Sequence, residues 1–370
     1  MEINWDGLYG QDNVKALLSK IIDSSNVPHA FLFQGIDGIG KDLTAFKFAE
    51  NLNAKFIDAK AFHIIQNQIR SLSEPYIKYI FPLPRGKNET ESNGPTEKLS
   101  EEEIQTIREE IEKKISNPYY KISIPKANTI KVNSIREIKK FISLDFSDIR
   151  FRVIIISDAH LMNEEAQNAL LKNLEEPPEG IIFILTTPFP NYLRETIRSR
   201  CWNIHFNPLQ NTALKEILVQ RFEVDEDLGI EIAPFSNGSI LNALQLIEND
   251  FEKLLERTIS FLRFSFGKKF NSAYDEISSF LYESDSQSIK LIIQMIITWL
   301  NDLQKYRIGS NDIYFADYKE TLIKFNTRFP KVSLNNLVSK LDNLSSIISN
   351  NVNLNVIALN LIFNVASLTT

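Results

Sequence analysis

The chain has 370 residues, with 41 Lys and Arg against 47 Asp and Glu, which gives a formal net charge of −6. This acidic balance argues against a protein that wraps nucleic acid with its whole surface. Hydrophobic residues make up 43% and charged residues 24%, as in ordinary globular proteins, and 12 glycines and 14 prolines exclude collagen-like and low-complexity classes. One cysteine excludes a disulfide framework and a cysteine-rich zinc site. The opening residues lack the pattern of a signal peptide, and the apolar segment 291–300 is too short to span a bilayer, so we expect a soluble cytoplasmic protein with no membrane contact.

The first half of the chain alternates strand-like and helix-like segments. Apolar runs at 30–34, 152–156 and 181–185 are typical of strands that are covered on both faces. Helical patterns follow at about 41–51 and at 163–174, and the second ends before Pro177. Strands separated by helices predict an α/β domain with a parallel sheet.

A polar stretch interrupts this domain. Residues 85–100 contain almost no apolar side chains, which predicts a solvated and mobile insertion. Ser100 and Glu103 then form a capping-box pattern at the start of a helix that runs to about Ile115. Isoleucines at 104, 107, 111 and 115 predict the stripe by which this surface helix packs.

From about residue 209 the β pattern gives way to helical periodicity, including an amphipathic segment at 289–306. We therefore predict an α/β domain at 1–208 with an insertion at about 85–116, a small helical domain at 209–250, and an all-helical domain at 251–370.

A glycine-containing loop, Gly35-Ile36-Asp37-Gly38-Ile39-Gly40-Lys41, lies between a predicted strand and a predicted helix. In that context backbone N–H groups and a lysine cradle phosphates, so Gly35, Gly38, Gly40 and Lys41 are candidate nucleotide-binding residues. The motif requires Ser or Thr next, to place a hydroxyl on magnesium, but the residue here is Asp42. An accidental glycine-rich turn is the alternative explanation.

The second half of such a site is an acidic pair after a buried strand, which orders magnesium and polarises water. Here Ser157 stands at the magnesium side, and Asp158 has a shorter reach than Glu. Asp42 and Ser157 are two departures from the motif that point the same way, and they argue against hydrolysis of ATP by this chain alone. Whether ATP with Mg²⁺ binds here is left open by the sequence.

Three segments resemble the bacterial replicative clamp-loader family of AAA+ proteins, in particular the subunits of DNA polymerase III. They are residues 28–35 (PHAFLFQG), residues 168–178 (NALLKNLEEPP) and residues 199–201 (SRC), and the opening WDGLYGQ at 5–11 is similar as well. The resemblance covers about residues 5–210. It implies an AAA+ P-loop fold for residues 1–208, a helical lid domain at 209–250, and a helical domain at 251–370 that serves oligomerisation. It also implies membership of a subunit ring and ATP-driven loading of a sliding clamp on primed DNA.

Within the family, the combination of a degenerate nucleotide site with an intact Ser-Arg-Cys resembles the delta-prime subunit. The family carries a sensor arginine in a Gly-Ser-x-Arg segment, where this chain has Leu241. Clamp-loader subunits commonly carry a four-cysteine zinc module, but residues 51–80 contain no cysteine, so we expect no zinc or other metal site. The insertion at about 85–116 lies close in the sequence to the region where relatives carry this zinc module.

The resemblance implies that Arg200, next to Ser199, reaches the γ-phosphate held by a neighbouring subunit. A surface arginine at the end of a turn is the alternative. Thr186 or Thr187 could fill the sensor position near that phosphate in active relatives, and our candidate is Thr187, although a plain strand-end hydroxyl fits equally well. Cys201 is expected to be a buried packing residue.

The expected function is a non-hydrolysing clamp-loader subunit that works with tau/gamma and delta subunits, the sliding clamp and primer-template DNA. An active tau/gamma-like ATPase is the main alternative, and a nucleotide-independent DNA-binding protein is a weaker one.

Overall fold

The computed structural model describes residues 3–24, 26–143, 149–282, 286–348 and 353–369. The chain forms two compact units, Met1–Ile217 with Gly238–Leu241, and Leu218–Asn237 with Asn242–Thr370. The predicted division into three domains remains a prediction, since the residues assigned to the lid domain are shared between both units.

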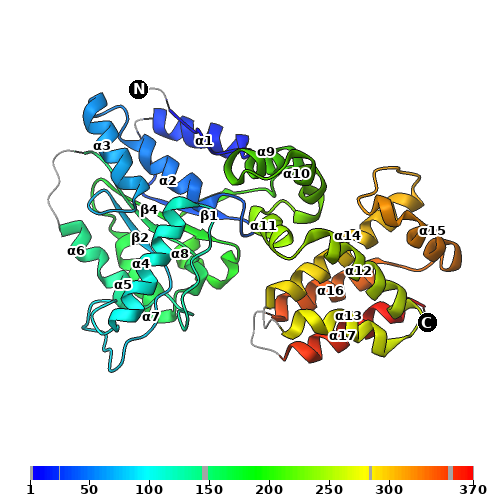
Figure 1. Cartoon of the computed structure of the whole chain (residues 1–370). Coiled ribbons are helices and arrows are strands. Elements are labelled where there is room, and N and C mark those ends of the chain that lie inside the picture. The colour runs from blue at the N-terminus through cyan, green and yellow to red at the C-terminus, as the bar shows by residue number, and fades with distance from the viewer. Residues whose placement is uncertain (1–2, 25, 144–148, 283–285, 349–352, 370) are drawn as a thin grey trace. The chain divides into compact units, whose positions relative to one another are not determined.

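The first unit is built around a five-stranded sheet (Figure 1). Its strands are β1 (Ala30–Gln34), β2 (Ile77–Ile80), β3 (Arg152–Ile156), β4 (Ile181–Thr187) and β5 (Trp202–His205). Its helices are α1 (Asp12–Asp23), α2 (Lys41–Leu52), α3 (Ala59–Arg70), α4 (Glu101–Ser116), α5 (Val132–Arg136), α6 (Ile138–Ser143), α7 (Glu164–Glu175), α8 (Glu195–Arg198) and the start of α9 (Asn211–Phe222), with short 3₁₀ turns η1 (Ala159–Leu161) and η2 (Pro190–Tyr192).

All strand pairs are parallel, in the order β2-β3-β4-β1-β5. One face of the sheet packs against α5 to α8 through a core that includes Leu32, Phe141 and Leu170. On the other face Phe31 meets Phe48 of α2 edge to face at 5.2 Å. Helices therefore cover both faces, as the continuous apolar runs indicated, and the predicted α/β class with a parallel sheet is confirmed.

The polar stretch before α4 packs more closely than its composition suggested. Gly86 lies against the backbone of Lys98, so residues 86–98 form a closed loop. Glu89 is only 7% exposed and accepts a hydrogen bond from Lys131 at 2.9 Å, while the Lys131 ammonium also donates to the Pro84 and Pro95 carbonyls. Most side chains of residues 85–100 are exposed, as expected of a solvated insertion, but the buried ion pair of Glu89 and Lys131 anchors the segment to the first unit.

The second unit is helical. It contains the remainder of α9, α10 (Glu226–Ile232), α11 (Ile240–Glu248) from Asn242 onward, α12 (Phe251–Phe266), α13 (Phe270–Tyr282), α14 (Ser286–Arg307), α15 (Lys319–Arg328), α16 (Asn335–Ile348) and α17 (Leu354–Ala366), with 3₁₀ turns η3 (Ala233–Ser236), η4 (Ala316–Tyr318) and η5 (Ser367–Thr369). Helix α14 contacts α12, α13, α15, α16 and α17 and buries Trp299 completely. Among the described helices, none combines the length and the apolar character that crossing a membrane requires.

Candidate functional site

The glycine-containing loop connects β1 to α2 at the carboxyl edge of the sheet, as its sequence predicted. Gly38 and Gly40 have φ values of 74° and 89°, which other residues adopt only with strain. A side chain at Gly38 would also collide with Ser239, whose Oγ would lie 2.4 Å from the added Cβ. Glycine is therefore required both by the turn of the loop and by the close approach of the segment 238–241.

Lys41 is turned back onto its own loop. Its ammonium donates to the carbonyls of Gly35 and Ile36 at 2.7 and 2.6 Å and lies 3.7 Å from the carboxylate of Asp37. Burial lowers the pKa of Lys41, although Asp37 and Asp42 oppose that shift. The lysine that the motif reserves for phosphate is thus engaged by groups of the protein.

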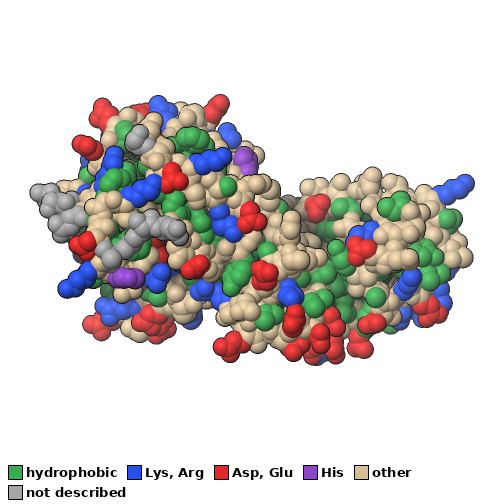
Figure 2. Space-filling view, turned by 90° about the horizontal axis from the view of Figure 1, so that it is seen from above, with side chains coloured by type: hydrophobic (Ala, Val, Ile, Leu, Met, Phe, Trp, Pro, Cys, Tyr) green, Lys and Arg blue, Asp and Glu red, His purple; other side chains and the backbone are tan. Residues whose placement is uncertain are grey.

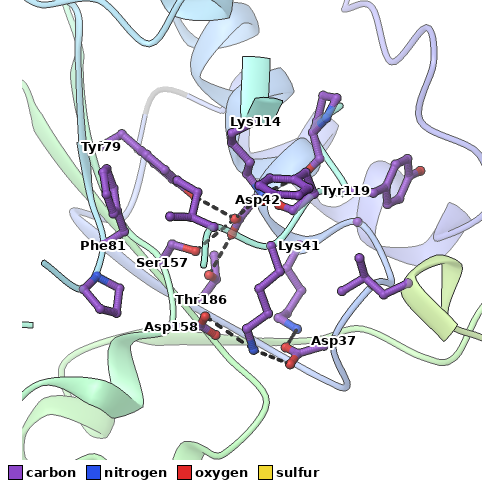
Figure 3. Close-up of a pocket in the computed structure, with 18 residues that line it drawn as sticks. Asp37, Lys41, Asp42, Tyr79, Phe81, Lys114, Tyr119, Ser157, Asp158 and Thr186 are labelled. Carbon is purple, nitrogen blue, oxygen red and sulfur yellow. Dashed lines mark hydrogen bonds and ion pairs between the residues drawn. The ribbon is translucent and has the colours of Figure 1, made fainter. Parts of the chain in front are cut away.

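Asp42 is the centre of the pocket (Figure 3). One carboxylate oxygen accepts hydrogen bonds from Tyr79 and Ser157, both at 2.9 Å, and lies 2.8 Å from the ammonium of Lys114. The other oxygen accepts a hydrogen bond from Thr186 at 2.8 Å. Burial by itself raises the pKa of Asp42, but the charge of Lys114 and these hydrogen bonds outweigh it and hold the pKa well below its usual range.

Lys114 comes from α4, in the insertion, and its side chain is only 4% exposed. Besides contacting Asp42, its ammonium donates to the carbonyls of Pro118 and Tyr120 at 2.9 and 2.8 Å. An ammonium group has three N–H donors, and these three acceptors match that number. The predicted isoleucine stripe of α4 is confirmed for Ile104, Ile107 and Ile111, which pack in one hydrophobic cluster. It is wrong for Ile115, which is 36% exposed, and the helix also buries Glu110 and Lys114.

A second lysine lies at the mouth of the pocket. The ammonium of Lys121 is 2.6 Å from the carboxylate of Asp37 and 3.5 Å from that of Asp158. Burial lowers the pKa of Lys121, but the two carboxylates outweigh that effect and raise it. Because the Lys121 side chain is 44% exposed, solvent screens this pair more than the pair of Lys114 and Asp42.

The two threonines at the end of β4 face different neighbours. Thr186 lines the pocket and binds Asp42, whereas the hydroxyl of Thr187 lies 3.1 Å from Nδ1 of His160 and accepts a hydrogen bond from the N–H of Phe189. Burial, followed by the positive charge of Lys121, lowers the pKa of His160 to about 4, so the ring is neutral near pH 7. The structure therefore puts Thr187, the candidate chosen from the sequence, outside the lining of the pocket.

The pocket does not fit a magnesium nucleotide. The position that needs a hydroxyl carries the carboxylate of Asp42, Ser157 replaces a metal-binding carboxylate, and Leu241 lines the pocket where the family has an arginine. The cavity that remains has a volume of about 60 Å³, which is room for a few water molecules. Among the described residues, no group of three or more His, Cys, Asp or Glu side chains is placed to hold a metal ion.

Arg200 and Ser199 follow α8 and do not line this pocket. The Arg200 guanidinium donates to the carbonyl of Thr196 at 2.9 Å and lies 3.0 Å from the carboxylate of Glu175, and its side chain is 36% exposed. Cys201 is buried in the core, where burial raises the pKa of its thiol to about 12. The candidate site therefore consists of two separate parts, the filled pocket and an arginine at the surface.

Sequence reasoning missed Lys114, Lys121 and Tyr79. One signal was available for Lys114, because a carboxylate at position 42, inside a phosphate-binding loop, needs a cation when it is buried. Nothing in the local sequence identified which lysine supplies that cation.

A family model described as "DNA polymerase III, delta subunit" matches residues 10–210, and one described as "DNA polymerase III, delta subunit, C terminal" matches residues 252–365. The chain belongs to the DNA polymerase III delta subunit family. The resemblance to the clamp-loader AAA+ proteins is thereby confirmed.

Relatives carry the names of several DNA polymerase III subunits. The chain is 26% identical to the delta-prime subunit of Bacillus subtilis over 317 residues, which cover 84% of this chain and 83% of that protein. It is 32% identical to a gamma subunit of Buchnera aphidicola over 247 residues, which cover 65% of this chain and 57% of that protein. It spans 30% of the length of the tau/gamma subunit of Haemophilus influenzae. A gamma-subunit-related protein of Thermotoga maritima aligns with 96% of this chain at 16% identity and a TM-score of 0.41.

Proposed function

We propose that this chain is a delta-prime-like subunit of the DNA polymerase III clamp loader and acts there without hydrolysing ATP. Its partners would be tau/gamma and delta subunits in the cytoplasm and, through the assembled complex, the sliding clamp and primer-template DNA. Membership of the delta subunit family supports this assignment.

The observation that carries the non-hydrolysing role is the ion pair between Asp42 and Lys114. Hydrolysis in P-loop enzymes depends on a magnesium ion held by a hydroxyl after the loop lysine and by a carboxylate after the next strand. Here a carboxylate and Ser157 take those two positions and bond to each other at 2.9 Å. The same geometry argues against the main alternative, an active tau/gamma-like ATPase.

The second part of the proposal concerns Arg200, with Ser199 as its neighbour in the motif. Its guanidinium is accessible from outside, and within the described part of the chain its carboxylate partner is the half-exposed Glu175. Such a pair contributes little to stability, so a phosphate could compete for the guanidinium. We propose that Arg200 stabilises the charge that develops on a nucleotide held by the neighbouring subunit, with its forked donors matching phosphate oxygens.

A DNA-binding protein that acts alone is less well supported. The net charge is −6, and on the face drawn in Figure 2 acidic and basic side chains are interspersed. Single-stranded nucleic acid is usually bound along a continuous basic groove with aromatic platforms. An affinity of the isolated chain for primed DNA that falls steeply with salt would favour this alternative.

The test is the DNA-stimulated ATPase of a clamp loader reconstituted with this chain, its clamp and primed DNA. Arg200→Ala should assemble normally and lower the rate, since fingers of this kind contribute about 10³–10⁵ at the site they serve. The overall loss should be smaller, because other sites in the ring use other arginines. Arg200→Lys should rescue poorly, because an ammonium lacks the forked geometry.

Arg136→Ala is the matched control, because Arg136 also bonds to a carbonyl and a carboxylate, those of Glu91, and is 47% exposed. It should leave the rate unchanged. Wild-type turnover by an assembled Arg200→Ala complex would refute the role of Arg200. Magnesium-dependent turnover by the isolated chain that Lys41→Ala abolishes would refute the non-hydrolysing assignment.

A further inference from the structure

The segment from Lys114 to Lys121 enters the pocket that the P-loop would offer to phosphates. It comprises the end of α4 and the turn that follows, and it delivers one buried ammonium to Asp42 and a second, more exposed one to Asp37 and Asp158. Figure 3 shows the side chain of Lys114 pointing down toward Asp42 from the end of α4.

The charges of the pocket balance within the protein. Three carboxylates, those of Asp37, Asp42 and Asp158, face the ammonium groups of Lys41, Lys114 and Lys121. A functioning P-loop offers uncompensated N–H groups and positive charge to an anion. Here a triphosphate would have to separate existing ion pairs and lie against three carboxylates, at an electrostatic cost that a low-dielectric pocket increases.

Residues 114–121 are also held in place by contacts within the chain, without the help of a ligand. Glu110 accepts hydrogen bonds from the hydroxyl of Tyr120 at 2.9 Å and from the N–H of Ser123 at 2.7 Å, which ties the turn to α4. At the other end of the helix, Ser100 and Glu103 form the capping box. A group that is held in its bound position loses little entropy on binding, so the segment is well suited to occupy the pocket permanently.

We propose that residues 114–121 are an internal ligand that takes the place of both nucleotide and metal in this P-loop. The inference rests on the proposed function in one respect, namely that this chain does not hydrolyse ATP. It adds a structural cause for that property, which is that residues 114–121 occupy the nucleotide site. The insertion keeps the nucleotide site closed and turns it into part of the structural core of the first unit.

The first test measures nucleotide binding to the full-length chain by its thermal unfolding midpoint, with and without Mg²⁺ and ATP or ADP. The wild type should show no shift. The variant Asp42→Thr/Lys114→Ala/Lys121→Ala should gain a rise of about 5 °C or more at nucleotide concentrations far above its Kd. A shift in the wild type would overturn the proposal, and so would a folded triple variant that still ignores nucleotide.

The second test uses conservative substitutions, so that it remains decisive if the triple variant fails to fold. Lys114→Met and Asp42→Asn each leave a buried charge or donor without its partner and should lower the midpoint by several degrees, whereas the double variant should recover more than half of the summed loss. Lys113→Met is the matched control, because Lys113 is adjacent on the same helix, is 55% exposed and forms its ion pair, with Glu110 at 2.8 Å, outside the lining of the pocket. Additive losses, or equal losses for Lys113→Met and Lys114→Met, would overturn the proposal.

A third measurement needs no variant. Reductive methylation of the folded wild type, followed by peptide mass mapping, should modify Lys113 and spare Lys114, and Mg²⁺ with ATP should not change that pattern. Rapid methylation of Lys114 would show that the segment leaves the pocket and would overturn the proposal. Failure of the inference is distinct from failure of the proposed function, because these readouts measure nucleotide binding, stability and lysine accessibility. The non-hydrolysing role is read from ATP turnover, and the role of Arg200 is read from the assembled complex.

Discussion

Deleting residues 87–97 should destabilise the protein although the segment is polar. Gly86 and Lys98 lie in contact, so the remaining ends can be joined with little displacement. The deletion removes Glu89 and the Pro95 carbonyl, so the ammonium of Lys131 keeps the Pro84 carbonyl as its remaining partner among these three.

The magnitude follows from the burial of this ion pair. The side chains of Glu89 and Lys131 are 3% and 10% exposed, and removal of one partner from a pair that stays buried costs about 3–5 kcal/mol. This cost is an upper limit here, because the deletion also opens Lys131 to water. Shortening the loop returns about 1 kcal/mol or less of closure entropy. For a unit of this size the net loss corresponds to a fall in the unfolding midpoint of up to roughly 15 °C.

The assay is thermal and urea unfolding of four chains: the wild type, the deletion, Lys131→Met, and the deletion combined with Lys131→Met. The combined variant should be more stable than the deletion alone, because no unpaired charge is left behind. Arg136→Ala, which removes an exposed pair with Glu91, should cost less than about 1 kcal/mol. A deletion that costs the same small amount with Lys131 or Met at position 131 would refute the reasoning.

Two further outcomes are expected. The folded-state pKa of Asp42 lies well below its usual value, so the stabilisation from its charge is complete above about pH 5 and is lost as the pH falls through the usual carboxyl range toward the folded-state value. The stability difference between wild type and Asp42→Asn in urea titrations should therefore begin to shrink at about pH 5 and still be shrinking at about pH 3, and a constant difference would contradict the assignment. Burial raises the pKa of the Cys201 thiol to about 12. Iodoacetamide at about pH 8 should therefore alkylate this thiol in urea and leave it unmodified in the native chain. Rapid labelling of the native chain would contradict the burial of Cys201.

The sheet and the P-loop were predictable because their signals are local. The apolar run at 30–34, the glycines that follow it and the helix from Lys41 lie within about twenty residues, and all three form as expected. The departures at Asp42 and Ser157 were also visible in the sequence. By contrast, β2 and β5 are strands of four residues each, too short for alternation to distinguish them.

The partners of Asp42 were not predictable, because they come from distant parts of the chain. Ser157 and Thr186 lie 115 and 144 residues away along the sequence. Lys114 is a charged residue in a helix, and such residues are usually solvated. The choice between Thr186 and Thr187 could not be made either, since β4 is buried along its whole length and its pattern does not tell one face from the other.

The ion pair between Asp42 and Lys114 also restricts which single substitutions the first unit tolerates. A single substitution of Asp42 by Thr, the residue type that magnesium chemistry needs, would leave the ammonium of Lys114 buried without its carboxylate. A single loss of Lys114 would leave the buried Asp42 carboxylate without its cation partner. Each of these single substitutions therefore destabilises the protein, so the chemistry of the pocket can change without loss of stability only if both residues change together.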